Sequence, residues 1–115
     1  MQPPLSLVKG TLDALVLKAL AWAPMHGFEI MTWLEERSGG ALALDDSGLY
    51  QALYRLEGRG LVAAEWGVTD NNRRARYYRI TTAGRAHLRR ETAQWVRYAE
   101  TVTGILTAAP AAQRS

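Results

Sequence analysis

The stretch that decides the fold is SGLYQALYRLEGRGLVAAEWGVTDNNRRARYYRIT, residues 47–81. Its first dozen residues repeat apolar side chains at helical spacing, which predicts an amphipathic helix. Leu61–Trp66 and Ala75–Thr81 have the composition of strands, and the polar turn Gly67–Arg74 joins them into a hairpin with a projecting, mobile tip. A helix followed at once by a hairpin predicts a winged helix-turn-helix.

Two more helices are predicted before this stretch. Apolar residues at positions i, i+3, i+4, i+7 and i+8 mark Gly10–Ala23 as an amphipathic helix. Similar spacing marks His26–Ser38, which the pair Gly39-Gly40 stops. The sequence therefore predicts three short helices ahead of the hairpin.

The junctions between these helices carry capping signals. His26 is expected in the turn and cap between the first two helices, and Asp45, Asp46 or Ser47 is expected to cap the third. The segment Ala41–Leu44 is short and apolar and is expected to form a small strand.

A long last helix is predicted over Thr82–Ala108. Leu88, Trp95 and Val102 recur every seven residues, and Tyr98 with Ala99 and Ile105 with Leu106 fill the positions between them. A helix of roughly 27 residues is about 40 Å long, too long for a core this small to cover, so a second copy of the chain is the expected cover.

The predicted fold is mainly α with a small β-hairpin wing, extended by a dimerisation helix. Residues 1–81 are expected to form the winged helix-turn-helix, residues 82–109 the dimerisation helix, and residues 110–115 a frayed tail.

Composition fits one globular domain: 115 residues, 48% hydrophobic and 22% charged. The chain has no cysteine, which excludes disulfides and thiolate metal sites and fits a reducing compartment. We find no signal-peptide pattern at the N-terminus, and the apolar stretch Leu12–Met25 is too short and too charged to span a bilayer. We therefore expect a cytoplasmic protein without a membrane partner.

Charge is divided unevenly along the chain. Residues 1–70 carry five Lys and Arg against nine Asp and Glu, whereas residues 71–115 carry nine Arg against two Glu. This asymmetry indicates a polyanionic partner, although an Arg-rich solvated helix would give the same count.

The predicted third helix has a polar face that suits DNA recognition. Glutamine can read adenine and arginine can read guanine or hold a phosphate, while the helix N-terminus can bind a phosphate. An ordinary solvated helix face would have the same composition. The candidate DNA-binding residues on this helix are Ser47, Gly48, Tyr50, Gln51, Tyr54 and Arg55.

The hairpin turn concentrates arginines, with four of them in residues 73–79. Arginines at the tip of a wing can grip phosphates or enter a minor groove, and the alternative is a charged loop that only confers solubility. Tyr78, in phase with Ile80, is expected in the core, which leaves Tyr77 on the functional face. The candidate DNA-binding residues of the wing are Asn72, Arg73, Arg74, Arg76 and Tyr77.

Tryptophans have two predicted roles. Trp95 is expected either in a dimer core or on the wall of a pocket for a small aromatic effector. Trp22, Trp33 and Trp66 are expected to be packing residues.

Other classes of function lack their motifs. His26 and His87 have no metal-ligand spacing, and we find no nucleophile elbow, Walker loop or GxGxxG, so no metal, cofactor or enzyme activity is expected. The rival interpretation is a winged-helix module that binds another protein instead of DNA. Such a module would not need arginines on its wing, and its binding would survive moderate salt.

Five segments in this order resemble the PadR family of transcriptional regulators, in its short form with one long C-terminal helix. The five segments are Gly10–Leu20, Met25–Ile30, Ser47–Glu57, Gly60–Trp66 and Asn72–Gly84, and the resemblance as a whole covers residues of about 5–106.

The resemblance implies a winged-helix dimer that binds operator DNA, usually as a repressor, and that in some members releases DNA when a small aromatic compound binds. It implies pairing through the long helix together with the first helix, which adds Leu12 to the interface expected of Leu88, Trp95, Tyr98, Val102, Ile105 and Leu106. Its recognition helix corresponds to Ser47–Arg55 and its basic wing to Asn72–Tyr77. Gln51 departs from the proline common in the family at this position, so no operator sequence can be transferred.

Overall fold

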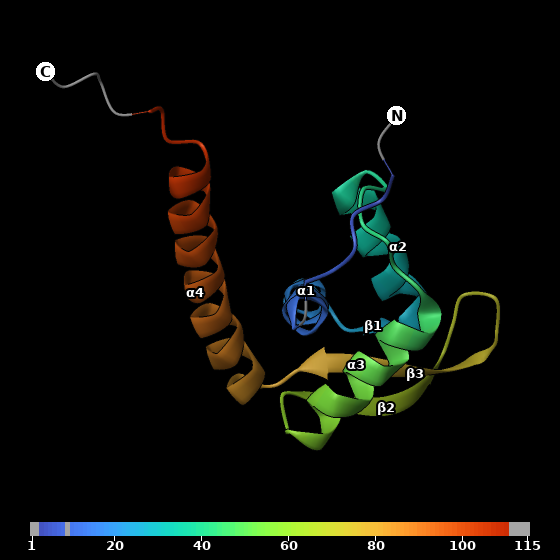
Figure 1. Ribbon diagram of the computed structural model, residues 1–115. Helices are drawn as coiled ribbons and strands as arrows, with labels where there is room; N and C mark the ends of the chain where they lie inside the picture. The colour runs from blue at the N-terminus through green and yellow to red at the C-terminus, as the bar shows by residue number, and fades with distance from the viewer. Residues whose placement is uncertain (1–2, 9, 111–115) are drawn as a thin grey trace, which may run out of the picture.

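The computed structural model describes residues 3–8 and 10–110. Helices α1 (Thr11–Leu20), α2 (Gly27–Ser38) and α3 (Asp46–Gly58) precede the long helix α4 (Thr82–Leu106). Strands β2 (Val62–Val68) and β3 (Arg74–Ile80) form the predicted hairpin. The helix-hairpin-helix order confirms the predicted winged helix-turn-helix with a long last helix (Figure 1).

A third strand was not predicted. β1 (Met25–His26) pairs antiparallel with β3, so the sheet order is β1-β3-β2 and β3 is central. Two residues are too few for any alternation of side chains to be visible in the sequence. The strand expected at Ala41–Leu44 is wrong, because this segment makes only an isolated bridge from Leu42 to Leu5.

Caps explain where the helices begin. His26 accepts a hydrogen bond from the backbone of Glu29 through Nδ1, and the Glu29 carboxylate accepts one from the His26 backbone, which completes a capping box. Asp45, rather than Asp46 or Ser47, caps α3 by accepting from the Gly48 N–H at 2.7 Å. The first helix ends at Leu20 and not at Ala23.

The core lies between α1, α2, α3 and the inner face of the sheet. Tyr78 and Ile80 are buried there, as predicted from their phase along β3. Trp33 packs at the edge of this core. Trp22 and Trp66 are 66% and 60% exposed, so their expected role in packing within the chain is wrong. The main buried side chains are Val16, Leu17, Leu20, Ile30, Leu34, Leu49, Leu53, Leu56 and Val62.

A tight junction joins α4 to the rest of the fold. Thr81 caps α4 by accepting from the Gly84 N–H at 3.0 Å, and its hydroxyl donates to the Gly60 carbonyl at 2.7 Å. Gly84 lies directly on the backbone carbonyl of Leu61, where a Cβ would overlap it. The end of α3 and the start of α4 are therefore fixed to one another.

Beyond its first turns α4 leaves the core. In Figure 1 it stands beside α1, and its C-terminal half rises away from every other element. No helix in the described part of the chain is long and apolar enough to cross a membrane. The tail expected at 110–115 lies outside the described residues except for Pro110.

Candidate nucleic-acid interface

One face of α3 is free of the core. Leu49, Ala52, Leu53 and Leu56 are buried, which turns the opposite side of the helix outward. Tyr54 is 81% exposed. Five of the six predicted residues of this helix line one shallow hollow on its surface: Ser47, Tyr50, Gln51, Tyr54 and Arg55. The sixth, Gly48, is half-buried and gives its N–H to the Asp45 cap.

Tyr50 is positioned by the start of α2. Its ring lies so close to the Cα of Gly27 that a Cβ there would overlap the ring and the hydroxyl. Because Gly27 has no side chain, the Tyr50 ring can rest on α2 while half of its surface stays exposed. This contact connects the first turn of α2 to the exposed face of α3.

Arg55 is held by a residue distant in sequence. Its Nη2 donates to Asp13 Oδ1 at 2.7 Å and its Nε donates to Asp13 Oδ2 at 3.4 Å. The hydrogen bond and the charge of Asp13 raise the pKa of Arg55 above its ordinary value. This predicted DNA-binding side chain is therefore paired with α1.

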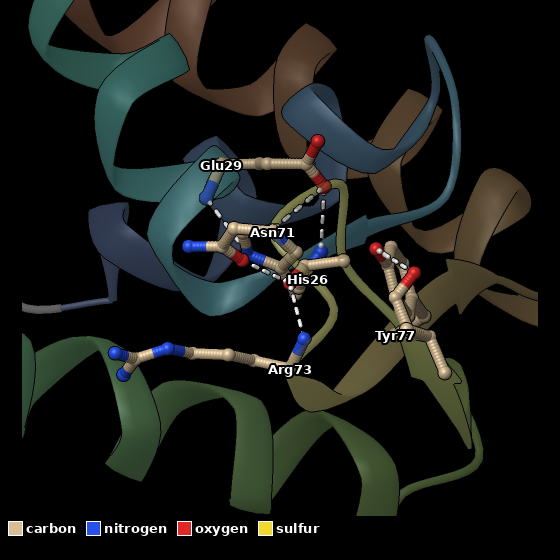
Figure 2. A network of polar contacts seen from close by, with 7 residues as sticks. His26, Glu29, Asn71, Arg73 and Tyr77 are labelled. Carbon is tan, nitrogen blue, oxygen red and sulfur yellow. Dashed lines mark hydrogen bonds and ion pairs between the residues drawn. The ribbon is translucent and has the colours of Figure 1, made fainter.

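Hydrogen bonds within the loop close the wing. The Thr69 N–H donates to the Arg73 carbonyl at 2.8 Å, and the Arg73 N–H donates to Thr69 Oγ1 at 3.1 Å. Asn72 has a φ of 63°, a left-handed conformation that asparagine tolerates better than most residues. Figure 2 shows this loop beside the start of α2, with the Arg73 side chain extending away from it. In Figure 1 the loop projects at the side of the molecule opposite α4.

The wing arginines differ in their partners. Arg76 forms two hydrogen bonds with Glu57 of α3, at 2.9 and 3.2 Å. Arg74 lies over the ring of Trp66, with its guanidinium carbon 4.5 Å from the ring centroid. Among the described residues, Arg73 and Arg74 have no carboxylate partner. These two cations next to the turn of the hairpin are therefore available to a polyanion.

Tyr77 supports the wing from its other face. Its ring meets the His26 ring edge-on, with centroids 5.3 Å apart, and lies across Gly67. Its hydroxyl donates to the Val68 carbonyl at 3.4 Å. The half-buried Tyr77 therefore ties the hairpin to the cap of α2.

A hollow of about 890 Å³ unites the start of α2, the ring of Tyr50 and the wing. Most of the predicted wing residues line it, together with three residues that the sequence reasoning missed: His26, Phe28 and Trp66. Phe28 is 76% exposed. The signal for Phe28 was available, because it lies outside the buried stripe of α2 at Ile30, Met31 and Leu34.

The predicted dimer residues divide into two groups. Leu12 and Leu88 are partly buried against the core of their own chain. The later positions along α4 have little cover: Trp95 is 45%, Tyr98 62%, Ile105 71% and Leu106 77% exposed. Val102 is half-buried. The centroids of the Trp95 and Tyr98 rings are 6.2 Å apart.

Residues 3–8 and 10–110 contain no group of three or more His, Cys, Asp or Glu side chains that could hold a metal ion. Within the same residues, every buried side-chain nitrogen or oxygen has a hydrogen-bond partner.

Known proteins share this architecture. A structure from Eggerthella lenta, described as a PadR family transcriptional regulator, is 32% identical with a TM-score of 0.74, covering 88% of this chain and 86% of its own. A structure from Streptococcus mutans has a TM-score of 0.79 at 24% identity and covers 98% of this chain and 100% of its own. Protein X of Lysinibacillus sphaericus is 26% identical over 96 residues, 84% of this chain and 88% of that protein.

The family model of the transcriptional regulator PadR-like family matches residues 16–90, which include all of α2, α3 and the wing. This match confirms the resemblance drawn from the sequence motifs. The chain belongs to the PadR-like family of transcriptional regulators.

Proposed function

We propose that the chain is a sequence-specific DNA-binding repressor that acts as a homodimer on a pseudo-palindromic operator. One observation carries the proposal: Arg73 and Arg74 stand on a projecting loop, without a carboxylate partner among the described residues, beside the exposed face of α3. A cationic loop next to an exposed helix matches the backbone and major groove of a duplex.

In this proposal α3 enters the major groove and the wing lies on the flanking backbone. Tyr50, Gln51 and Tyr54 face the bases, while the Ser47 hydroxyl near the start of the helix approaches a phosphate. Gly48 lies beside Ser47, with its N–H bonded to the Asp45 cap. Arg55 lies beside them. The wing residues assigned to the backbone are Asn72, Arg73, Arg74, Arg76 and Tyr77.

The dimer is proposed to form through α4. The face by which Gly84 and Leu88 meet the core continues along the helix as Trp95, Tyr98 and Val102, where the described part of the chain offers little cover. A second copy of the chain would bury this seam, together with α1 around Leu12. Two-fold pairing then sets the half-sites roughly 34–36 Å apart, or at a multiple of that spacing.

A small aromatic effector is proposed to bind at Trp95. The exposed pair of Trp95 and Tyr98 offers a flat apolar wall of the kind that such ligands prefer. Titration of the dimer with a panel of aromatic compounds should change the fluorescence of Trp95. If no compound changes it, this part of the proposal is wrong. As a regulator the protein would act where the DNA lies, which we take to be the cytoplasm.

The proposal is tested by a salt series of binding to the region upstream of the chain's own gene and to a scrambled duplex. Tighter binding to the upstream duplex and a steep salt slope are expected. Arg73→Ala should weaken binding to both duplexes and flatten the slope by about one unit. Arg85→Ala is the matched control, since it removes the same charge in the first turn of α4, beyond the end of β3 that lies away from the wing loop.

Two outcomes would contradict the proposal. Equal weak binding to both duplexes would remove the sequence-specific role and favour the protein-binding module. Equal effects of Arg73→Ala and Arg85→Ala would show that the wing is not at the interface.

A further inference from the structure

The pair Asp13–Arg55 joins two helices that the chain separates by 42 residues. Asp13 lies in the first turn of α1, and its side chain is only 17% exposed, whereas that of Arg55 is 52% exposed. Two donors of the Arg55 fork point to the two oxygens of one carboxylate. Such a bidentate pair fixes direction as well as distance.

The location of α1 gives this pair its importance. Val16, Leu17, Ala19 and Leu20 bury one side of α1 in the core. The same helix contacts both α3 and α4. Asp13 thus connects a helix anchored in the core to the exposed face of α3.

We propose that Arg55 is a positioning residue and not a DNA contact: with Asp13 it fixes the angle of α3 on α1. Tyr50, Gln51 and Tyr54 then meet the major groove in one orientation. This inference rests on the proposed DNA binding. It reverses the sequence-based expectation that Arg55 reads a base or a phosphate.

The two roles predict opposite effects of removing Asp13. If Arg55 were a DNA contact, Asp13 would compete with DNA for the guanidinium, and Asp13→Asn would tighten binding and steepen the salt slope. If Arg55 positions α3, Asp13→Asn loosens the helix and weakens operator binding. The affinity for a scrambled duplex depends little on the orientation of the base-reading side chains, so it should not fall.

The experiment measures binding of wild type, Asp13→Asn and the double variant Asp13→Asn/Arg55→Gln to the upstream and scrambled duplexes in a salt series. Both variants should lose about tenfold in the ratio of the two affinities, comparable to the loss of one good base contact. The double variant removes one negative and one positive charge, so the net charge is unchanged and the salt slope should stay that of the wild type. Surface ion pairs contribute little to stability, so both variants should fold, which circular dichroism checks.

Asp46→Asn is the matched control. It also removes one carboxylate near the start of α3, and Asp46 forms no ion pair within the described residues. It should leave the ratio of affinities unchanged.

The inference is overturned if Asp13→Asn keeps or raises the wild-type ratio, or if the double variant flattens the salt slope by about one unit. A wild-type protein that does not discriminate between the duplexes would instead overturn the proposed function, and the positioning role with it. The two failures are therefore distinguishable in one data set.

Discussion

The ring of Tyr50 rests on the Cα of Gly27, and this contact fixes where the Tyr50 side chain lies on the exposed face of α3. Gly27 is the first residue of α2 and has no left-handed φ, so its backbone would accept alanine. The constraint on this position comes from the neighbouring ring alone.

Gly27→Ala should therefore displace Tyr50 without unfolding the chain. Because the half-exposed ring can rotate outward, we expect a stability loss of only about 1 kcal/mol, similar to an off-rotamer side chain. Operator affinity should fall more than stability does. Urea unfolding and duplex binding measure the two effects. The control is Tyr50→Leu: in that background Gly27→Ala should cost little, and an equal cost in both backgrounds would exclude the ring contact as its cause.

Gly84→Ala should destabilise the fold strongly. The added methyl would overlap the backbone carbonyl of Leu61, which cannot swing away as a side chain can, so a loss of about 2 kcal/mol or more is expected. Gly104→Ala on the same helix has open space around it and should gain up to about 1 kcal/mol from helix propensity. Chemical denaturation measures the free energy of unfolding of both variants. Similar values for Gly84→Ala and Gly104→Ala would contradict the tight junction between α3 and α4.

Ile105→Glu should abolish dimerisation. Ile105 is 71% exposed in the single chain, so the substitution has little to disrupt within one protomer but would place a charge in the proposed seam. Gly104→Glu adds the same charge about 100° around α4 from Ile105, on the side away from Leu88, Trp95 and Val102, and should stay dimeric. Sedimentation equilibrium separates the two outcomes. A monomeric wild type, or a dimeric Ile105→Glu, would rule out pairing through this face.

Trp66 should report DNA binding by its fluorescence. It is exposed, it lines the hollow beside the wing, and Arg74 lies over its ring. A duplex that engages Arg74 would change the surroundings of the indole, and Trp66→Phe should abolish most of the fluorescence change. Trp22→Phe is the control, since Trp22 is also exposed but lies outside that hollow. If Trp22→Phe removes the signal instead, the wing is not where DNA binds.

Periodicity made most of the fold predictable from the sequence. Helices α1 to α4 and the hairpin each have an apolar repeat or a turn signal, and the caps at His26 and Asp45 rest on local chemistry. Strand β1 was missed because two residues carry no period. Two of the three tryptophans expected in packing failed for a related reason, because hydrophobicity alone did not reveal that Trp22 and Trp66 lie past the edge of the core.

The exposure of most candidate residues was predictable from the sequence, but their contacts were not. Sequence reasoning placed most of the candidate residues of α3 and the wing on the surface, and it assigned Arg55 and Arg76 to DNA without finding their partners. Their partners Asp13 and Glu57 are 42 and 19 residues away, and no local pattern connects them. The same holds for Tyr77, whose contact with His26 depends on the unpredicted pairing of β1 with β3.

The hydroxyl of Thr81 couples the orientation of α4 to that of α3. Because this one group bonds both the turn that follows α3 and the first turn of α4, we expect a pivot of the long helix to move α3 as well. Over 25 residues, or about 38 Å, a tilt of about 5° at Thr81 displaces the far end by about 3 Å. In the proposed dimer, a small rearrangement where the two α4 helices cross would change the distance between the two α3 helices. The operator spacing that the dimer can span would change with it.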